Sequence, residues 1–103
     1  MASGRLGSAD LTAVTNTSLY TVPTGKVSTF SVCFCNRTAL PALVRLALAS
    51  AATPANGEWL LYDIVVDGNG SIERTGLVLD AAKFAVVYAN NAGVSATAYG
   101  FEE

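Results

Sequence analysis

The sequence contains no histidine and few charged residues. Only 14% of its 103 residues are Asp, Glu, Lys or Arg, and the formal net charge is −2, whereas an average soluble domain is about 25% charged. Six basic residues against eight acidic ones provide no basic surface for nucleic acid. No apolar run reaches the ~18 residues of a membrane span, and no apolar core typical of a signal peptide follows the first residues. We therefore expect no nucleic-acid partner and no membrane partner.

The absence of histidine also argues against an enzyme. Histidine is the commonest general base and the commonest neutral metal ligand, and without it serine and threonine hydroxyls lack their usual activating partner. Among the carboxylates, Glu58 and Asp63 lie on one expected strand at a spacing that places them on opposite sides of it. We predict no catalytic residues, no metal site and no cofactor.

Short stretches of alternating residues, separated by turns, run through most of the chain. The clearest is 26–36, where Phe30, Val32 and Phe34 share one face. Residues 42–49 also alternate; their alanine and leucine content suits a short helix as well, but the alternation and the preceding proline favour a strand. Further strands are expected at 18–22, 58–66, 71–75, 77–79, 83–89 and 94–101, with 11–15 as an additional candidate.

Turns rich in glycine and asparagine separate these segments. Residues 67–70 combine Asp-Gly with Asn-Gly, which favours a type I′ hairpin, and 90–93 form a second candidate hairpin turn. The first turn faintly resembles a calcium loop as well, but it lacks the spacing of an EF-hand. About seven or eight short strands with turns every ~8–12 residues predict an all-β, antiparallel two-sheet β-sandwich, for which the jelly roll is one candidate arrangement.

The length corresponds to a single domain. We expect residues 10–103 to form one β-sandwich domain. Residues 1–9 are small and mostly polar, and we expect them to form a flexible or partner-bound N-terminal arm.

Two cysteines lie on one face of the strand at 26–36. The side chains of Cys33 and Cys35 run parallel near the upper limit of disulfide spacing, so a disulfide between them is disfavoured. A zinc site needs four ligands, which two cysteines without histidine do not supply unless subunits share it. We interpret both as small buried apolar residues and expect assembly in a reducing compartment. Three Asn-x-Ser/Thr sequons are interpreted as turn residues, because no signal peptide accompanies them.

An arginine and several aromatic residues are the candidates for contacts with other molecules. Arg45 lies in an otherwise apolar strand, where an unpaired charge is costly, so we predict an ion pair with Asp63 or Glu73, with a ligand contact as the alternative. Trp59 and the tyrosines could form a platform that stacks on sugars. Leucines follow Trp59 directly, which favours a place in the core or an interface instead.

Six segments form a recognisable combination. Residues 15–26 contain a short strand that enters a Val-Pro-Thr-Gly-Lys turn before a long strand. The other segments are 35–37, 44–48, 58–63, 73–77 and 99–103. Together they resemble small β-sandwich virion proteins of tailed bacteriophages over residues 10–103, with 1–9 outside the similarity. Such proteins include capsid cement or decoration proteins and parts of head or tail fibres, and the resemblance implies no catalytic residues.

The resemblance and the low charge lead to the same expectation about function. A small domain has a large surface for its volume, and burial against other chains would explain why so little of it is charged. We expect a phage structural protein that cements or decorates the capsid as a homo-oligomer, most simply a homotrimer, bound to the major capsid protein. It would be assembled in the bacterial host cytoplasm and lie on the capsid surface of the virion. The candidate interface residues are Arg37, Arg45, Trp59, Tyr62, Arg74, Tyr99 and Phe101.

Two alternatives remain open. One is a head-fibre or tail-fibre/adhesin module from the same kind of virion, which could bind a host glycan. The other is a non-viral carbohydrate-binding or pilus-like β-sandwich. A chain of 103 residues with no coiled coil favours cement over fibre.

Overall fold

Eight antiparallel strands make up the fold, so the predicted two-sheet β-sandwich is confirmed. The computed structural model describes residues 3–103. One 3₁₀ turn, η1 (Asn56–Glu58), interrupts the strands. The strands are β1 (Ser3–Asp10), β2 (Thr17–Thr21), β3 (Ser28–Asn36), β4 (Ala42–Ala49), β5 (Trp59–Val66), β6 (Ser71–Leu79), β7 (Phe84–Ala89) and β8 (Val94–Glu102).

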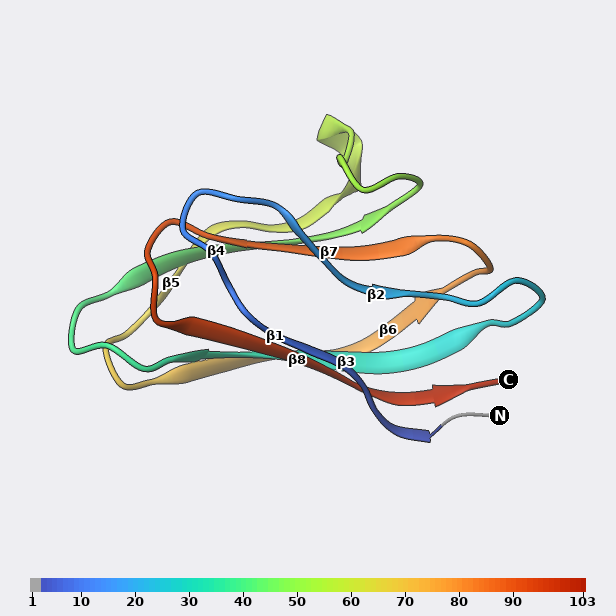
Figure 1. Ribbon diagram of the computed structural model, residues 1–103, viewed down its shortest axis with the longest axis horizontal. Helices are drawn as coiled ribbons and strands as arrows, with labels where there is room; N and C mark the ends of the chain where they lie inside the picture. The colour runs from blue at the N-terminus through green and yellow to red at the C-terminus, as the bar shows by residue number, and fades with distance from the viewer. Residues whose placement is uncertain (1–2) are drawn as a thin grey trace.

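The strands form two four-stranded sheets that lie face to face as two layers (Figure 1). Sheet A has the order β1-β8-β3-β6, and sheet B has the order β2-β7-β4-β5. Every connection passes from one sheet to the other except β4 to β5, which are neighbours in sheet B. Eight strands connected in this order are a jelly roll, the double-sheet arrangement built from two Greek keys.

The two predicted hairpin turns are present as turns, but they do not form hairpins. Residues 67–70 join β5 of sheet B to β6 of sheet A, and 90–93 join β7 of sheet B to β8 of sheet A. The turn at 67–70 also packs on the β3–β4 connection: Asn69 N donates to Thr38 O at 2.7 Å, and a Cβ on Gly68 would lie 2.2 Å from Ala39 O. The hairpin prediction was wrong because turn chemistry fixes only the local bend, whereas the strand partner depends on distant segments.

The beginning of the chain is a strand of the domain. Residues 3–9, expected to be an arm, belong to β1, which pairs with β8 from Ser3 opposite Phe101 to Asp10 opposite Ser95. Small residues allow this edge to approach β2 closely, since a Cβ on Gly7 would lie 2.3 Å from Leu19 O. Residues 1–2 of the expected arm lie outside the described residues. Partner binding by this segment stays a prediction.

Two further strand predictions differ from the structure. Residues 11–15 form a connection, in which Val14 adopts a φ of 54° and donates its N–H to Ala89 O at 2.8 Å. The segments 71–75 and 77–79 merge into one strand, β6, because Gly76 adopts a φ of 72°. The pairing register of β3 and β6 shifts there, from Phe30 opposite Leu77 to Val32 opposite Arg74. A bulge of this kind lets the ladder continue after the irregular residue.

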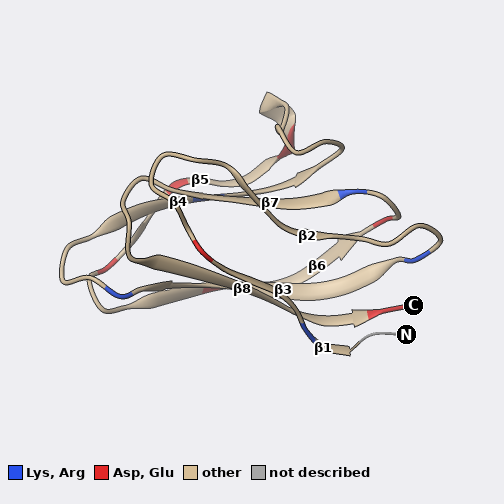
Figure 2. Cartoon of the chain, viewed as in Figure 1, with Lys and Arg blue, Asp and Glu red and all other residues tan. Residues whose placement is uncertain are grey.

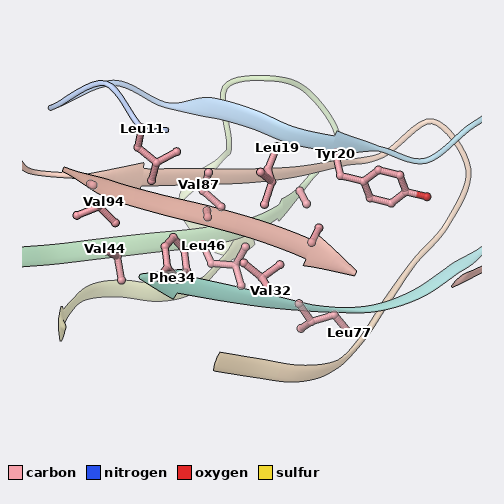
Figure 3. Packing of buried hydrophobic residues seen from close by; sticks show 14 of the residues in the cluster. Leu11, Leu19, Tyr20, Val32, Phe34, Val44, Leu46, Leu77, Val87 and Val94 are labelled. Atoms are coloured by element: carbon pink, nitrogen blue, oxygen red, sulfur yellow. The ribbon is translucent and has the colours of Figure 1, made fainter. Parts of the chain in front are cut away.

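The core fills the space between the sheets with one face of each strand. The predicted alternation of β3 is confirmed: Phe30, Val32 and Phe34 are buried and face inward. Val44 and Leu46 meet them from β4 in sheet B (Figure 3). The residues on either side of each inward residue therefore point away from the core.

Polar groups bridge the layers at one end of the core. The Tyr20 hydroxyl, from sheet B, donates to Glu102 Oε2 of sheet A, and Ser28 Oγ of sheet A bonds to the Tyr20 oxygen. The Tyr20 ring packs edge-on against Phe30, with ring centroids 5.6 Å apart. Burial and the bond to Glu102 raise the pKa of Tyr20 from 10.0 to about 12.

The hydrogen bond from Tyr20 to Glu102 makes the stability of the fold depend on pH in the alkaline range. Tyr20→Phe leaves Glu102 and Ser28 without this partner, so at about pH 8 we expect the free energy of unfolding to fall by about 1–3 kcal/mol. The folded protein holds the Tyr20 proton more tightly than the unfolded chain does, so this contribution is present below pH 10 and lost as the pH rises towards 12. In urea titrations, the deficit of the variant should therefore shrink across that range. A deficit of Tyr20→Phe that stays constant over this pH range would contradict this assignment. So would a deficit of the exposed-residue control Tyr62→Phe that shrinks in the same way.

Candidate functional site

The seven candidate interface residues do not gather in one place. On or beside sheet B lie Arg45, Trp59 and Tyr62. On the outer face of sheet A lie Tyr99 and Phe101. Arg37 lies in the β3–β4 connection, and Arg74 lies on the edge strand β6.

Arg45 lies on the outer face of sheet B and forms the predicted ion pair with Asp63. Its Nε donates to Asp63 Oδ1 at 2.7 Å and its Nη2 to Oδ2 at 3.3 Å. A bulge in β5 makes this possible, because two residues, Tyr62 and Asp63, lie between the partners of Val44 and Leu46, opposite Arg45 alone. Asp63 adopts a φ of 56° in this bulge. Glu73, the other predicted partner, lies in sheet A.

Aromatic rings enclose the Arg45 guanidinium. Its Cζ lies 4.1 Å from the ring centroid of Tyr62, 4.3 Å from that of Tyr88 and 6.0 Å from that of Trp59. The Trp59 and Tyr62 rings meet edge to face at 5.5 Å. The hydrogen bonds to Asp63 hold the pKa of Arg45 above its ordinary value, so the guanidinium stays charged. We call Arg45, Trp59, Tyr62, Asp63 and Tyr88 the arginine–aromatic cluster.

A small apolar cluster lies beside it on the same outer face. Ala47, Ala49 and Val86 are fully buried there, although they point away from the main core, because Trp59 and Phe84 pack over them. Trp59 therefore has a packing role, in agreement with one of the two interpretations of its position. Tyr62 contacts Arg45 and Trp59, but 54% of its surface remains exposed.

A depression opens next to these two rings. It has a volume of about 360 Å³ and is lined by Asn56, Trp59 and Tyr62. The Glu58 carboxylate holds the 50–58 segment in place, accepting bonds from Ala55 N at 2.8 Å and from Ser50 N and Oγ at 3.1 Å each. These backbone bonds, the one from Ala55 first, lower the pKa of Glu58. Asn56 is thus presented by a connection whose shape is fixed by its own hydrogen bonds.

The outer face of sheet A has a different character. Its central strands, β3 and β8, carry no charged residue on this face, because the one charge in either strand, Glu102, is buried. Figure 2 shows where the charged residues lie: in the connections, at strand ends and within β1, β4, β5 and β6. The outward residues of the two strands are Thr29, Ser31, Cys33, Cys35, Ser95, Thr97, Tyr99 and Phe101.

The prediction that both cysteines are buried was wrong. Cys33 is half-buried and Cys35 is exposed, and both thiols are free. They alternate with the inward residues Val32 and Phe34, so the sandwich places them outside. Burial, followed by the nearby Glu73 carboxylate, raises the pKa of Cys33.

Exposed apolar side chains meet at one end of this face. Thr29 of β3 lies directly opposite Phe101 on one side and Val78 on the other, and Tyr99 lies opposite Ser31 in the adjacent row. Val78 is 59% exposed and Phe101 39% exposed. Directly opposed residues share a face, so these side chains form one surface, which we call the β8 patch: Thr29, Ser31, Val78, Tyr99 and Phe101.

The two remaining arginines among the candidate residues, Arg37 and Arg74, are exposed and lie away from both surfaces. Arg37 forms an ion pair with Asp10, which links the β3–β4 connection to the end of β1. Arg74 lies on β6 opposite Val32 and has no ion-pair partner among residues 3–103.

Three contributing residues were not identified from the sequence. Tyr88 lies opposite Arg45 across the β4–β7 pair, Asn56 lines the depression, and Val78 completes the β8 patch. Tyr88 belongs to a strand that was expected from the sequence, at 83–89. Its position beside Arg45 depends on the pairing register, which no local pattern contains.

Residues 3–103 contain no helix long and apolar enough to cross a membrane, and no group of three or more His, Cys, Asp or Glu side chains able to hold a metal ion. Comparisons with protein-family models, curated proteins and solved structures find no match to this chain.

The enclosed Arg45 ion pair should contribute more to stability than the exposed Arg37 pair. Arg45→Met removes an ion pair worth about 0.2–1 kcal/mol and two ring contacts worth about 0.5–1 kcal/mol each, so we expect the free energy of unfolding to fall by about 1–3 kcal/mol. Arg37→Met removes only a solvent-exposed pair and should cost less than about 0.5 kcal/mol. Urea denaturation measures both. Equal losses would show that the aromatic enclosure adds nothing.

Proposed function

We propose that this protein is a structural, non-catalytic component of a virion, which cements or decorates a phage capsid through protein–protein contacts as a homotrimer. The observation that carries the proposal is the β8 patch on the outer face of sheet A, where the central strands β3 and β8 carry no outward charge. Under this proposal the protein assembles in the bacterial host cytoplasm and lies on the capsid surface, bound to the major capsid protein.

The character of the sheet A face supports a contact with other chains. A solvated face of an antiparallel sheet commonly carries polar and charged side chains, whereas here β3 and β8 offer hydroxyls, thiols and two aromatic rings. Interface cores are depleted in charge and enriched in tyrosine and phenylalanine, as at Tyr99 and Phe101. A trimer closes by cyclic symmetry, so this face would meet a different surface of the next copy.

Two further observations agree with the proposal without carrying it. Free thiols at Cys33 and Cys35 suit a protein assembled in a reducing cytoplasm. Jelly rolls are common among viral capsid domains and also among lectins and cupins. A fold by itself therefore does not identify a function.

A second candidate function is a head-fibre or tail-fibre/adhesin module that binds a host glycan. The observation that favours it is the depression lined by Asn56, Trp59 and Tyr62 on the opposite side of the molecule from the β8 patch. Exposed aromatic rings next to polar side chains are typical of small-ligand sites.

Oligomeric state tests the proposed assembly surface. Light scattering coupled to size exclusion should give the wild-type protein a mass three times the 10.6 kDa of one chain. Replacing Val78 and Phe101 by serine should weaken the trimer at least about tenfold, a loss of about 1.4 kcal/mol. The control is Val65→Ser, at a similarly exposed valine of β5 (53%, against 59% for Val78) in the other sheet, which should leave the mass unchanged. A monomeric wild-type protein, or a trimer indifferent to the double change, would contradict the proposal.

The place of the protein in a particle separates the two candidate functions. Cryo-electron microscopy of virions carrying it should show copies distributed over the whole shell, because cement occupies every equivalent position of a symmetric capsid. Copies confined to fibres or to the tail would instead support the second candidate. Absence of the protein from purified virions would contradict both.

A further inference from the structure

We propose that the depression beside the arginine–aromatic cluster binds a neutral pyranose saccharide of one or two rings. This inference rests on the second proposed function, glycan recognition, and adds the site and the chemical class of the ligand. It is independent of the β8 patch, which lies on the other sheet.

The two rings at the depression provide an apolar corner. Arg45 stacks on the Tyr62 ring at 4.1 Å, yet more than half of Tyr62 remains exposed, so the ring keeps a free face for a ligand. Trp59 meets Tyr62 at an interplanar angle of 72°. A pyranose ring has one face lined by C–H groups, which pack against the electron-rich face of an aromatic ring.

Polar groups at the rim suit hydroxyls. The Asn56 side chain lines the depression and supplies both donors and an acceptor. A few placed polar groups around an aromatic wall are the usual composition of a small-ligand site. The volume of about 360 Å³ lies at the small end of such sites, which fits one or two sugar rings better than a peptide.

The charges around the depression favour a neutral ligand over an acidic one. Arg45 is the cation of the cluster, and its charge is offset by Asp63, bonded at 2.7 Å. Glu58 follows Asn56 closely in η1 and is also anionic. Lys83 lies near Glu58, so each cation here already has a carboxylate beside it, and a carboxylate or sulfate on the sugar would find no free positive charge.

The site is also held in shape before a ligand arrives. The three bonds to Glu58 fix the connection that carries Asn56, and the Arg45–Asp63 pair, set by the β5 bulge, fixes the Tyr62 ring. Prior ordering of this kind reduces the entropy lost on binding.

The test is a titration of the ¹⁵N-labelled full-length protein, followed by amide and indole NMR shifts, with maltose, cellobiose and lactose as neutral probes. Digalacturonate and sialyllactose serve as acidic probes. We expect at least one neutral probe to shift the Trp59 indole and Asn56 signals, with a dissociation constant of about 1–10 mM. Tyr62→Ala should weaken that binding at least tenfold, and Tyr62→Phe, which keeps the ring, should retain it. Val65→Ala, on the same strand but outside the depression, is the matched control.

Each outcome decides a separate part of the inference. Tighter binding of the acidic probes would overturn the neutral class while leaving glycan recognition intact. Neutral binding that is unchanged by Tyr62→Ala would overturn the assigned site. If no probe of either class shifts any signal at about 10 mM, both this inference and the second candidate function fail, and the assembly proposal is unaffected.

Discussion

Burial of apolar strand faces between the two layers is the constraint on which the other features of this molecule depend. Strand side chains alternate, so once Val44 and Leu46 enter the core, Arg45 between them must face outward. The same rule places Cys33 outside, between Val32 and Phe34. Core packing therefore decides which residues are available for contacts with other molecules. At one end of the core Tyr20 donates a hydrogen bond to Glu102, and no buried side-chain N or O atom among residues 3–103 lacks a hydrogen-bond partner.

The low charge of the chain has a different consequence on each outer face. On sheet B, Trp59 and Phe84 pack over Ala47, Ala49 and Val86, and tyrosines enclose the lone arginine, although the edge strand β5 exposes Leu60, Ile64 and Val65. On sheet A, the central strands β3 and β8 carry no outward charge, and their surface ends beside the exposed Val78 of β6. We place assembly on sheet A because of these uncharged central strands, and small-ligand binding beside sheet B because of the depression at Trp59 and Tyr62.

Prediction from the sequence succeeded where the information was local. The strands at 42–49 and 83–89 were recognised from alternation, and Asp63 was one of two partners proposed for Arg45 because a charge inside an apolar strand needs an opposite charge. It failed where distant segments decide. The turns at 67–70 and 90–93 have hairpin chemistry but connect different sheets, and residues 3–9 become a strand only because β8 offers them an edge.

The sequence by itself determined most of the strands, the inward face of β3 and the scarcity of charge, since these follow from composition and from residue order over a few positions. Only the tertiary structure decided which strands are neighbours. Tyr88 reaches Arg45, and Phe101 and Val78 meet across Thr29, through pairings between segments far apart in the chain. Register between such segments is set by the packing of all eight strands at once, so no short pattern encodes it. The β8 patch and the arginine–aromatic cluster therefore form only when these distant strands pair.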